Sequence, residues 1–152
     1  MRSSGGILLY RKRDGVIEVL LAHMGGPIWG KKDNGAWSIP KGETNEGEDI
    51  FAAAQREFTE ETGLVAQGNF IKLGSVVSAS GKHIHVWAVV GDCNYATLTS
   101  NTFTMEWPPH SGQQQEFPEN DRYGFFTLIA AREKIQPSQI PFLERLEKTM
   151  DG

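Results

Sequence analysis

The sequence predicts an α/β fold, because strand-like segments lie on both sides of a helical segment and helical patterns return near the end. Apolar residues make up 39% of the 152 residues and charged residues 22%, which is ordinary for a globular protein with a substantial core. Neither the length nor the composition requires a second domain. We therefore expect one domain that spans residues 1–152.

Four segments have the apolar and β-branched residues typical of strands. They are residues 6–10, 16–24, 70–79 and 83–90. The first two should pair as a hairpin around the turn-like residues 13–15, and residues 80–82 should form the turn between the last two. Thr127 is a candidate N-cap for the first of two closing helical segments, and the second of these should cover the sheet.

The central helix, expected between Asp49 as N-cap and Gly63 as C′ residue, carries acids on an unusual face. At about 100° per residue, Glu57 and Glu61 lie one turn apart, with Glu60 beside them. Solvated acids, the common origin of such a cluster, would be expected on the opposite, outward face. Three carboxylates beside the apolar stripe instead predict a cation. Oxygen ligands suit a hard divalent ion such as Mg²⁺ or Mn²⁺, which also binds substrate phosphates.

The stretch 42–64 resembles the Nudix box, the signature of hydrolases that cleave a nucleoside diphosphate linked to another moiety. Every fixed position of the box is matched, by Gly42, Glu48, Arg56, Glu57, Phe58, Glu60, Glu61, Gly63 and Leu64. The family fold is an α/β/α sandwich around a mixed central sheet. The resemblance implies that this fold takes up roughly the whole chain.

The resemblance also implies roles for individual residues. The divalent-metal ligands would be Glu57, Glu60 and Glu61. The main-chain carbonyl of Lys41 would also coordinate the metal, and Arg56 would pair with Glu48 to hold the loop and the helix in register. The general base in the family is either a box glutamate, which is Glu57 here, or a glutamate from a late loop.

Lys41 bears on the substrate, because it lies in a segment, Trp37–Gly42, that is similar to the form seen in dinucleoside-polyphosphate hydrolases and some Nudix enzymes that cleave nucleoside triphosphates. By that resemblance, the Lys41 side chain would contact a substrate phosphate. A tyrosine typical of one dinucleoside-polyphosphate branch is absent from residues 80–82. We expect a nucleoside triphosphate or a dinucleoside polyphosphate as the substrate.

The segment 25–43, before and into the box, is rich in glycine and holds aromatic residues and lysines. Trp29 has two equally good interpretations, as a packed loop aromatic or as a surface on which a nucleobase stacks. Lys32 is a candidate phosphate contact, although a lysine in such a loop is more often simply solvated. Trp37 lies in a strand-like run, and we expect it to pack in the core.

The segment 94–120 shows little periodicity and is too long for a connecting loop without a function in a compact domain. Its aromatic residues argue against disorder, so the sequence predicts a lid or specificity loop beside the active site. Many Nudix enzymes draw an extra glutamate from a late loop, as a metal ligand or as the general base. Glu116 or Glu119 is the candidate for that role, although each acid alone is more often solvated.

The charge and the cysteine count narrow the class of partner and the compartment. A net charge of −4 gives no general basic field, so we expect a small nucleotide partner and no long nucleic acid. Cys93 is the only cysteine, which fits a reducing compartment. The first apolar run is too short for a signal-peptide core, and no stretch approaches a membrane span. A cytoplasmic location is the expectation, and the oligomeric state stays open.

Two functions from different classes follow. The first is metal-assisted hydrolysis of a pyrophosphate bond, in which the box acids hold Mg²⁺ or Mn²⁺ against the phosphates and a carboxylate takes a proton from water. The second is a Nudix-fold module that senses a nucleotide without cleaving it. Such modules often lose box carboxylates, and here all of them are present. The sequence therefore favours the enzyme.

Overall fold

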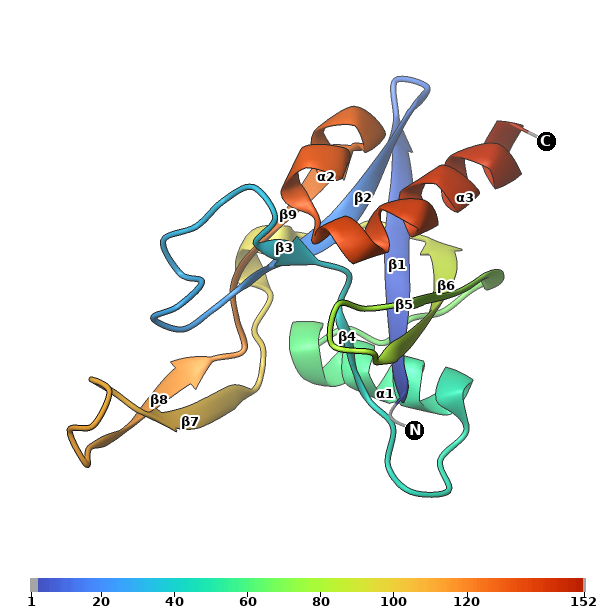
Figure 1. The fold of residues 1–152 in the computed structure, drawn as a ribbon. Coiled ribbons are helices and arrows are strands. Elements are labelled where there is room, and N and C mark those ends of the chain that lie inside the picture. The colour runs from blue at the N-terminus through green and yellow to red at the C-terminus, as the bar shows by residue number, and fades with distance from the viewer. Residues whose placement is uncertain (1–2, 152) are drawn as a thin grey trace.

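The computed structural model describes residues 3–151, which form a mixed sheet between helices (Figure 1). The strands are β1 (Ser3–Arg13), β2 (Val16–Met24), β3 (Trp37–Ser38), β4 (Lys41–Glu43), β5 (Ile71–Val77), β6 (His83–Val90), β7 (Thr102–Glu106), β8 (Gln114–Pro118) and β9 (Asn120–Thr127). The helices are α1 (Ile50–Thr62), α2 (Leu128–Lys134) and α3 (Ile140–Asp151), with 3₁₀ turns η1 (Tyr95–Thr97) and η2 (Pro137–Gln139). No helix within this range combines the length and apolar character that crossing a membrane requires.

The main sheet has seven strands in the order β3-β2-β1-β6-β5, with β4 paired to β1 and β9 paired to β2. β1 and β6 run parallel and the other pairs are antiparallel, so the sheet is mixed, as the family resemblance implied. The predicted β1–β2 hairpin is present, with Tyr10 opposite Val19. Its turn places Asp14 at φ 53° and Gly15 at φ 80°, the left-handed backbone that a tight hairpin turn requires.

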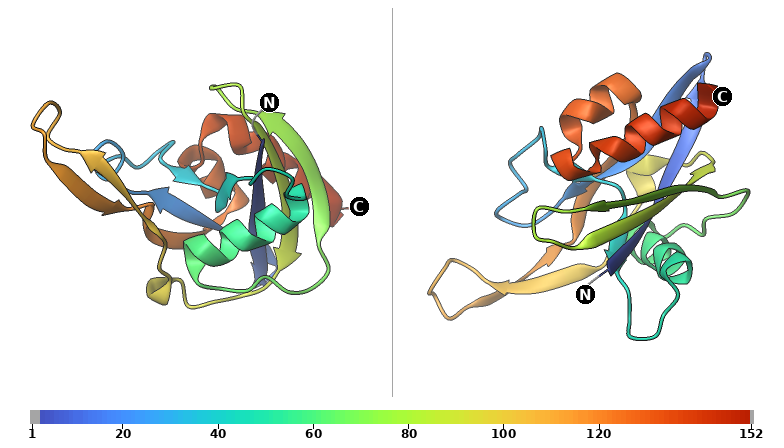
Figure 2. Two further views of the ribbon diagram at one scale, coloured as in Figure 1. Left: turned by 90° about the horizontal axis from the view of Figure 1, so that it is seen from below. Right: turned by 45° about the vertical axis from the view of Figure 1, so that its right-hand side comes forward.

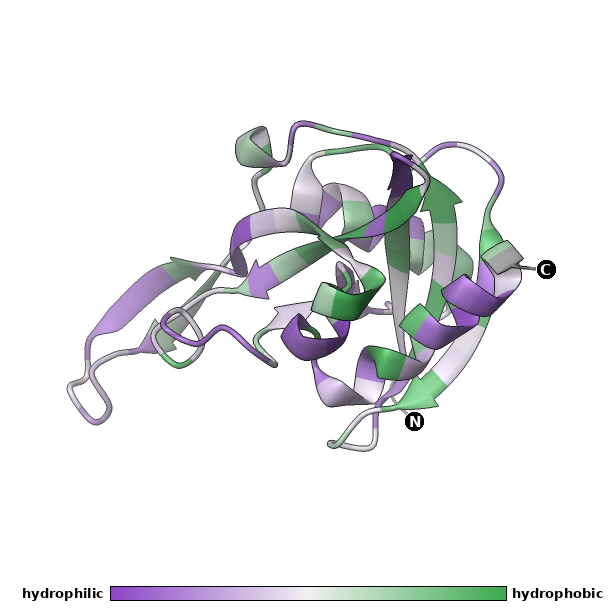
Figure 3. Cartoon of the chain, turned by 90° about the horizontal axis from the view of Figure 1, so that it is seen from above, coloured by the Kyte–Doolittle hydropathy of each residue, from purple (hydrophilic) through white to green (hydrophobic). Residues whose placement is uncertain are grey.

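The sheet has a hydrophobic core on each face, and helices cover both faces (Figure 2). Side chains of β1 alternate between the two cores: Ile7 and Leu9 join Phe58 of α1, whereas Leu8 and Tyr10 face the side that α2 and α3 cover. Figure 3 shows hydrophobic residues concentrated along the central strands. The α/β/α sandwich that the resemblance implied is therefore the observed fold.

Helix α1 begins and ends where the sequence predicts. The Asp49 carboxylate accepts a hydrogen bond from the main-chain N–H of Ala52 (3.1 Å), and Gly63 caps the other end at φ 80°. Gly5 lets α1 approach β1 closely, because a Cβ at that position would lie 2.7 Å from the carbonyl oxygen of Ile50. This contact between helix and strand fixes where the acids of α1 lie relative to the sheet.

The C-terminal helices also agree with the sequence. Thr127 caps α2, since its Oγ1 accepts a hydrogen bond from the N–H of Ala130 (3.2 Å). Leu143 and Leu146 of α3 are buried in the core beside the sheet. Trp37 is 6% exposed and lies in the same core, as predicted.

The segment 94–120 differs from the prediction, because it contains a two-stranded antiparallel hairpin rather than a loop without strands. β7 and β8 pair with Phe103 opposite Phe117, and the hairpin projects from the body of the molecule (Figure 1). The alternation of Thr and apolar residues in β7 is a strand pattern, but it is only five residues long. Its partner β8 begins with three polar residues and has one aromatic residue, Phe117, so β8 alone shows no alternation of apolar and polar residues that would predict a strand. A lid role for the hairpin stays a prediction.

Candidate active site

The acids of α1 lie in a cleft of about 500 Å³ between the helix, β4 and the base of the β7–β8 hairpin. Glu57, Glu60 and Glu61 line this cleft from the helix, Lys41 lines it from β4, and Glu119 lines it from the residue before β9. Residues that are far apart in the sequence thus meet in one place. Of the two late-loop candidates, the cleft takes in Glu119, whereas Glu116 lies exposed on β8 outside it.

The side chain of Glu57 lies directly on Gly42. A Cβ on Gly42 would come within 2.0 Å of the Glu57 carboxyl carbon, so only glycine leaves room for this carboxylate. The Glu57 side chain is 17% exposed. Its burial raises the pKa of the Glu57 carboxyl, against the opposing effect of Arg56.

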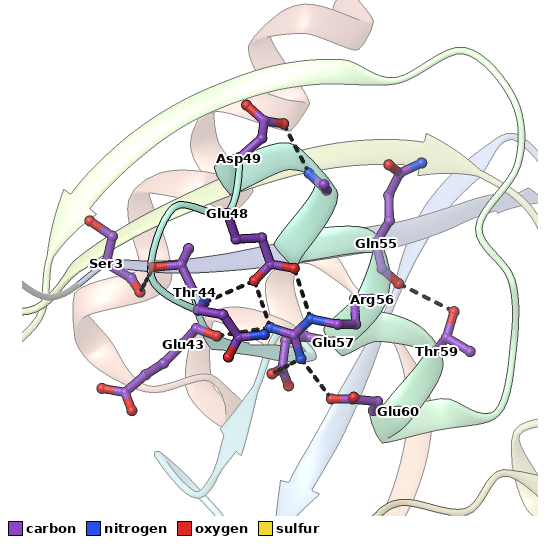
Figure 4. A network of polar contacts seen from close by, with 12 residues as sticks. Ser3, Glu43, Thr44, Glu48, Asp49, Gln55, Arg56, Glu57, Thr59 and Glu60 are labelled. Carbon is purple, nitrogen blue, oxygen red and sulfur yellow. Dashed lines mark hydrogen bonds and ion pairs between the residues drawn. The ribbon is translucent and has the colours of Figure 1, made fainter.

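Arg56 ties the loop to the helix (Figure 4). Its Nε and Nη2 donate to the two carboxylate oxygens of Glu48, each at 2.9 Å, and Nη2 also donates to the carbonyl of Glu43 at 3.1 Å. Nη1 donates to Glu57 Oε1 at 2.8 Å and to Glu60 Oε2 at 3.0 Å. The Arg56 hydrogen bonds hold the pKa of Glu48 down at about 2. The loop residues Glu43 and Glu48 thus fix the Arg56 guanidinium of α1, and this one group orients two of the three helix acids.

Glu61 is held from the other side, by β9. The side-chain amide of Asn120 donates to Glu61 Oε1 at 2.7 Å, and the hydroxyl of Tyr123 donates to the main-chain carbonyl of Glu61. Burial raises the pKa of the Glu61 carboxyl to about 8, and the charge of Glu57 adds to that shift. The site therefore disfavours the charged form of Glu61 when no cation faces it.

Two lysines face these acids. Burial lowers the pKa of Lys41, although the nearby Glu61 carboxylate opposes that shift. Lys82, on the β5–β6 turn, lines the same cleft and pairs with Glu43 at 3.1 Å. Lys82 gives no signal of a site in the sequence, because it is a lysine in a turn, and only the fold brings that turn beside β4.

The donor set fits a hard divalent cation. Five glutamates line the cleft against the two lysines, which leaves an excess of carboxylate oxygen. The raised pKa values of Glu57 and Glu61 show that burial is not fully compensated by positive charge within the protein. Within residues 3–151, no group of three Asp, Glu, His or Cys side chains has the arrangement of a metal site. The three helix acids instead have partners within the protein: Arg56 binds Glu57 and Glu60, and Asn120 binds Glu61.

The structure does not bring Trp29 and Lys32 to this cleft. They lie in the loop after β2, where the Lys32 ammonium is 4.8 Å from the centre of the Trp29 ring. That loop is fastened elsewhere: buried His23 contacts the carbonyl of Lys32, and Asp33 accepts a hydrogen bond from Trp37 Nε1 at 2.9 Å. The local Trp29–Lys32 contact agrees with the packed-loop interpretation of Trp29, and a role in substrate binding for either residue stays a prediction.

Asn120 was also missed in the sequence. It directly follows Glu119, and as a neutral amide it carries no charge pattern that would place it beside an acid 59 positions earlier. Only the pairing of β9 with β2 brings it next to Glu61.

Two curated proteins are similar to parts of this chain. The RNA pyrophosphohydrolase of Caulobacter vibrioides is 40% identical over 55 residues, which are 33% of this chain and 32% of that protein. The Nudix hydrolase 7 of Arabidopsis thaliana is 51% identical over 35 residues, 23% of this chain and 12% of its own length. The chain thus spans about a third or less of the curated relatives that it matches.

Among solved structures, the binary complex of a C. elegans Ap4A hydrolase superimposes with a TM-score of 0.67 and 22% sequence identity, covering 100% of this chain and 99% of that one. This likeness establishes the fold. A family model described as the NUDIX domain matches residues 1–146. The chain therefore belongs to the NUDIX domain family.

Proposed function

We propose that this protein hydrolyses a pyrophosphate bond in a nucleotide-type substrate. The observation that carries the proposal is the meeting of Glu57, Glu60 and Glu61 with Lys41 and Glu119 in one cleft. Carboxylates alone would repel the phosphates of such a substrate, so the proposal includes a divalent ion between them. The names of two similar proteins, an RNA pyrophosphohydrolase and an Ap4A hydrolase, support the same reaction class.

The residues that would hold Mg²⁺ or Mn²⁺ are Glu57, Glu60, Glu61, Glu119 and the main-chain carbonyl of Lys41. When bound, the ion supplies positive charge for the phosphates and lowers the pKa of a coordinated water. Glu116 drops out of this set, because it lies on the exposed strand β8.

The protein's own groups supply orientation and proton transfer. Arg56 fixes the carboxylates of Glu57 and Glu60 through hydrogen bonds of 2.8 and 3.0 Å. Lys41 faces the carboxylates from β4, where its ammonium can meet a phosphate oxygen. The proton of the attacking water goes to Glu57 or to Glu119. These two acids line the cleft and correspond to the two alternative general bases of the family, a box glutamate and a late-loop glutamate.

The proposed substrate is a nucleoside triphosphate or a dinucleoside polyphosphate. Lys41 and Lys82 line the cleft together, so more than one phosphate of a chain can meet a lysine. A cleft of about 500 Å³ is within the range of ordinary small-molecule sites.

The test is release of phosphate and pyrophosphate from a panel of nucleotides in Mg²⁺, for the wild type and for Glu57→Gln, Glu61→Gln and Glu119→Gln. Glu116→Gln is the matched control, since it removes a charge from the same late segment outside the cleft. We expect turnover of at least one nucleotide by the wild type and the control, with losses of about 10²-fold or more in the Glu57 and Glu61 variants. If the wild type binds a nucleotide but does not cleave it in Mg²⁺ or Mn²⁺, the proposal of an enzyme is wrong and the protein is a nucleotide-sensing module.

A further inference from the structure

One neutral side chain lies against the buried acids of the cleft. Asn120, the first residue of β9, is 7% exposed, and its amide nitrogen lies 2.7 Å from Glu61 Oε1. The contact joins two elements separated by 59 positions in the sequence. The amide nitrogen is the donor in this contact, and because an ionised carboxylate only accepts hydrogen bonds, the NH₂ side of the amide suits the charged, cation-binding form of Glu61.

Asn120 is itself fixed in place. Its main-chain N–H donates to Ser100 Oγ at 3.0 Å, and Ser100 Oγ donates to the Asn120 carbonyl at 3.1 Å. Ser100 and Asn120 lie on the two legs of the β7–β8 hairpin, next to the hydrogen bond from Glu119 N–H to the Asn101 carbonyl at 2.8 Å. The amide therefore projects from a rigid junction rather than from a free loop.

The same strand holds both ends of Glu61. Asn120 binds Oε1 of the carboxylate, and the Tyr123 hydroxyl donates to the main-chain carbonyl of the same residue. In the part of the chain that the structure covers, 3–151, Glu61 Oε2 has no hydrogen-bond partner. One oxygen is thus anchored to β9 while the other is left for the cleft.

We propose that Asn120 is a positioning residue of this hydrolase: it holds Oε1 of Glu61 and thereby presents Oε2 to the bound cation. The proposal rests on the proposed function and adds to it a residue outside the Nudix box. The chemistry explains why an amide occupies the position. An acid there would set two carboxylates against each other, and an apolar residue would let the Glu61 side chain rotate.

The experiment compares Asn120→Leu, which has a similar branched shape but no donor, and Asn120→Ala with the control Asn69→Ala. The control removes an exposed amide just before β5, which does not line the cleft. Direct binding of Mn²⁺ is measured by calorimetry without nucleotide. The kcat and KM for the best nucleotide of the panel and the melting temperature are measured on the same samples.

We expect both Asn120 variants to bind Mn²⁺ about 10- to 100-fold more weakly than the control and to lose kcat by a similar factor. The KM for the nucleotide should change less than about threefold, because Asn120 does not line the cleft itself. Using two variants guards against one that does not fold.

Three results would overturn the proposal: Mn²⁺ affinities within about twofold of the control in the folded variants, a loss confined to KM, or a wild type that does not bind Mn²⁺. If the wild type binds Mn²⁺ but cleaves no nucleotide, the proposed function falls, and the Mn²⁺ titration still decides whether Asn120 positions Glu61.

Discussion

Replacing Gly42 with alanine should lower the activity strongly and the stability only slightly. In the structure, a Cβ on Gly42 would lie 2.0 Å from both the carboxyl carbon and Oε2 of Glu57. Ordinary contact is about 3.5–4.0 Å, so the carboxylate has to move by about 1.5 Å or more. The clash involves the end of a flexible side chain, which can turn away, so the free energy of unfolding should fall by no more than about 1–2 kcal/mol.

Activity should respond much more strongly than stability. A displacement of about 1 Å in a reacting group can lower a rate about 10²-fold, which corresponds to about 2.7 kcal/mol in activation free energy. We therefore expect Gly42→Ala to lose at least about 100-fold in kcat/KM while its urea-unfolding curve stays close to that of the wild type.

Gly47→Ala is the control for this prediction. Gly47 lies at φ 74° in the loop that follows β4, and nothing lies within 4 Å of the Cβ that would be added. This variant introduces backbone strain without touching Glu57, so it should lose about 1 kcal/mol of stability and keep most of its activity. Activity of Gly42→Ala within about threefold of the wild type would show that the Glu57 carboxylate tolerates the added methyl group, and equal inactivation of both variants would show that the loss does not come from Glu57.

Three further predictions concern stability. Asp49→Ala removes the N-cap of α1, whose carboxylate accepts from Ala52 N–H, and should lower the free energy of unfolding in urea by about 0.5–2 kcal/mol; an unchanged midpoint would contradict that role. Gly5→Ala should lower it by about 1–3 kcal/mol, because the new Cβ meets the main chain of α1 at 2.7 Å, and a fully stable variant would show that α1 can shift. The folded-state pKa of Glu61, about 8, lies above its ordinary 4.5, so metal-free protein should lose stability as pH rises from about 5 to 8, and Glu61→Gln should flatten this slope in urea titrations.

Local signals predicted much of the fold. The caps Asp49 and Gly63 set the bounds of α1, and the turn at Asp14–Gly15 set the first hairpin, because each depends on neighbouring residues alone. The β7–β8 hairpin was missed for the converse reason. It pairs one short strand that alternates with a second strand that is mostly polar. The two strands therefore have too few apolar residues to show a strand pattern in the sequence.

Site residues that are close in the sequence could likewise be predicted, whereas those brought together by strand pairing could not. The box acids and their Arg56–Glu48 ion pair lie within one loop and one helix, so spacing on the chain was sufficient to group them. Lys82 and Asn120 reach the cleft only through strand pairing, and neither residue type signals a ligand by itself. For the loop after β2, the sequence left two interpretations open, and the structure places Trp29 and Lys32 outside the cleft and against each other, while a role of either residue in substrate binding stays a prediction.

The dependence of this site on a metal is tested most directly by the rate of nucleotide hydrolysis after complete removal of divalent ions and again after the return of Mg²⁺. We expect no turnover in chelator, recovery of the wild type with Mg²⁺, and no recovery of Glu57→Gln under the same conditions. Turnover that persists without divalent ions, or equal recovery of the wild type and Glu57→Gln, would contradict the assignment of the α1 acids as a metal-dependent hydrolytic centre.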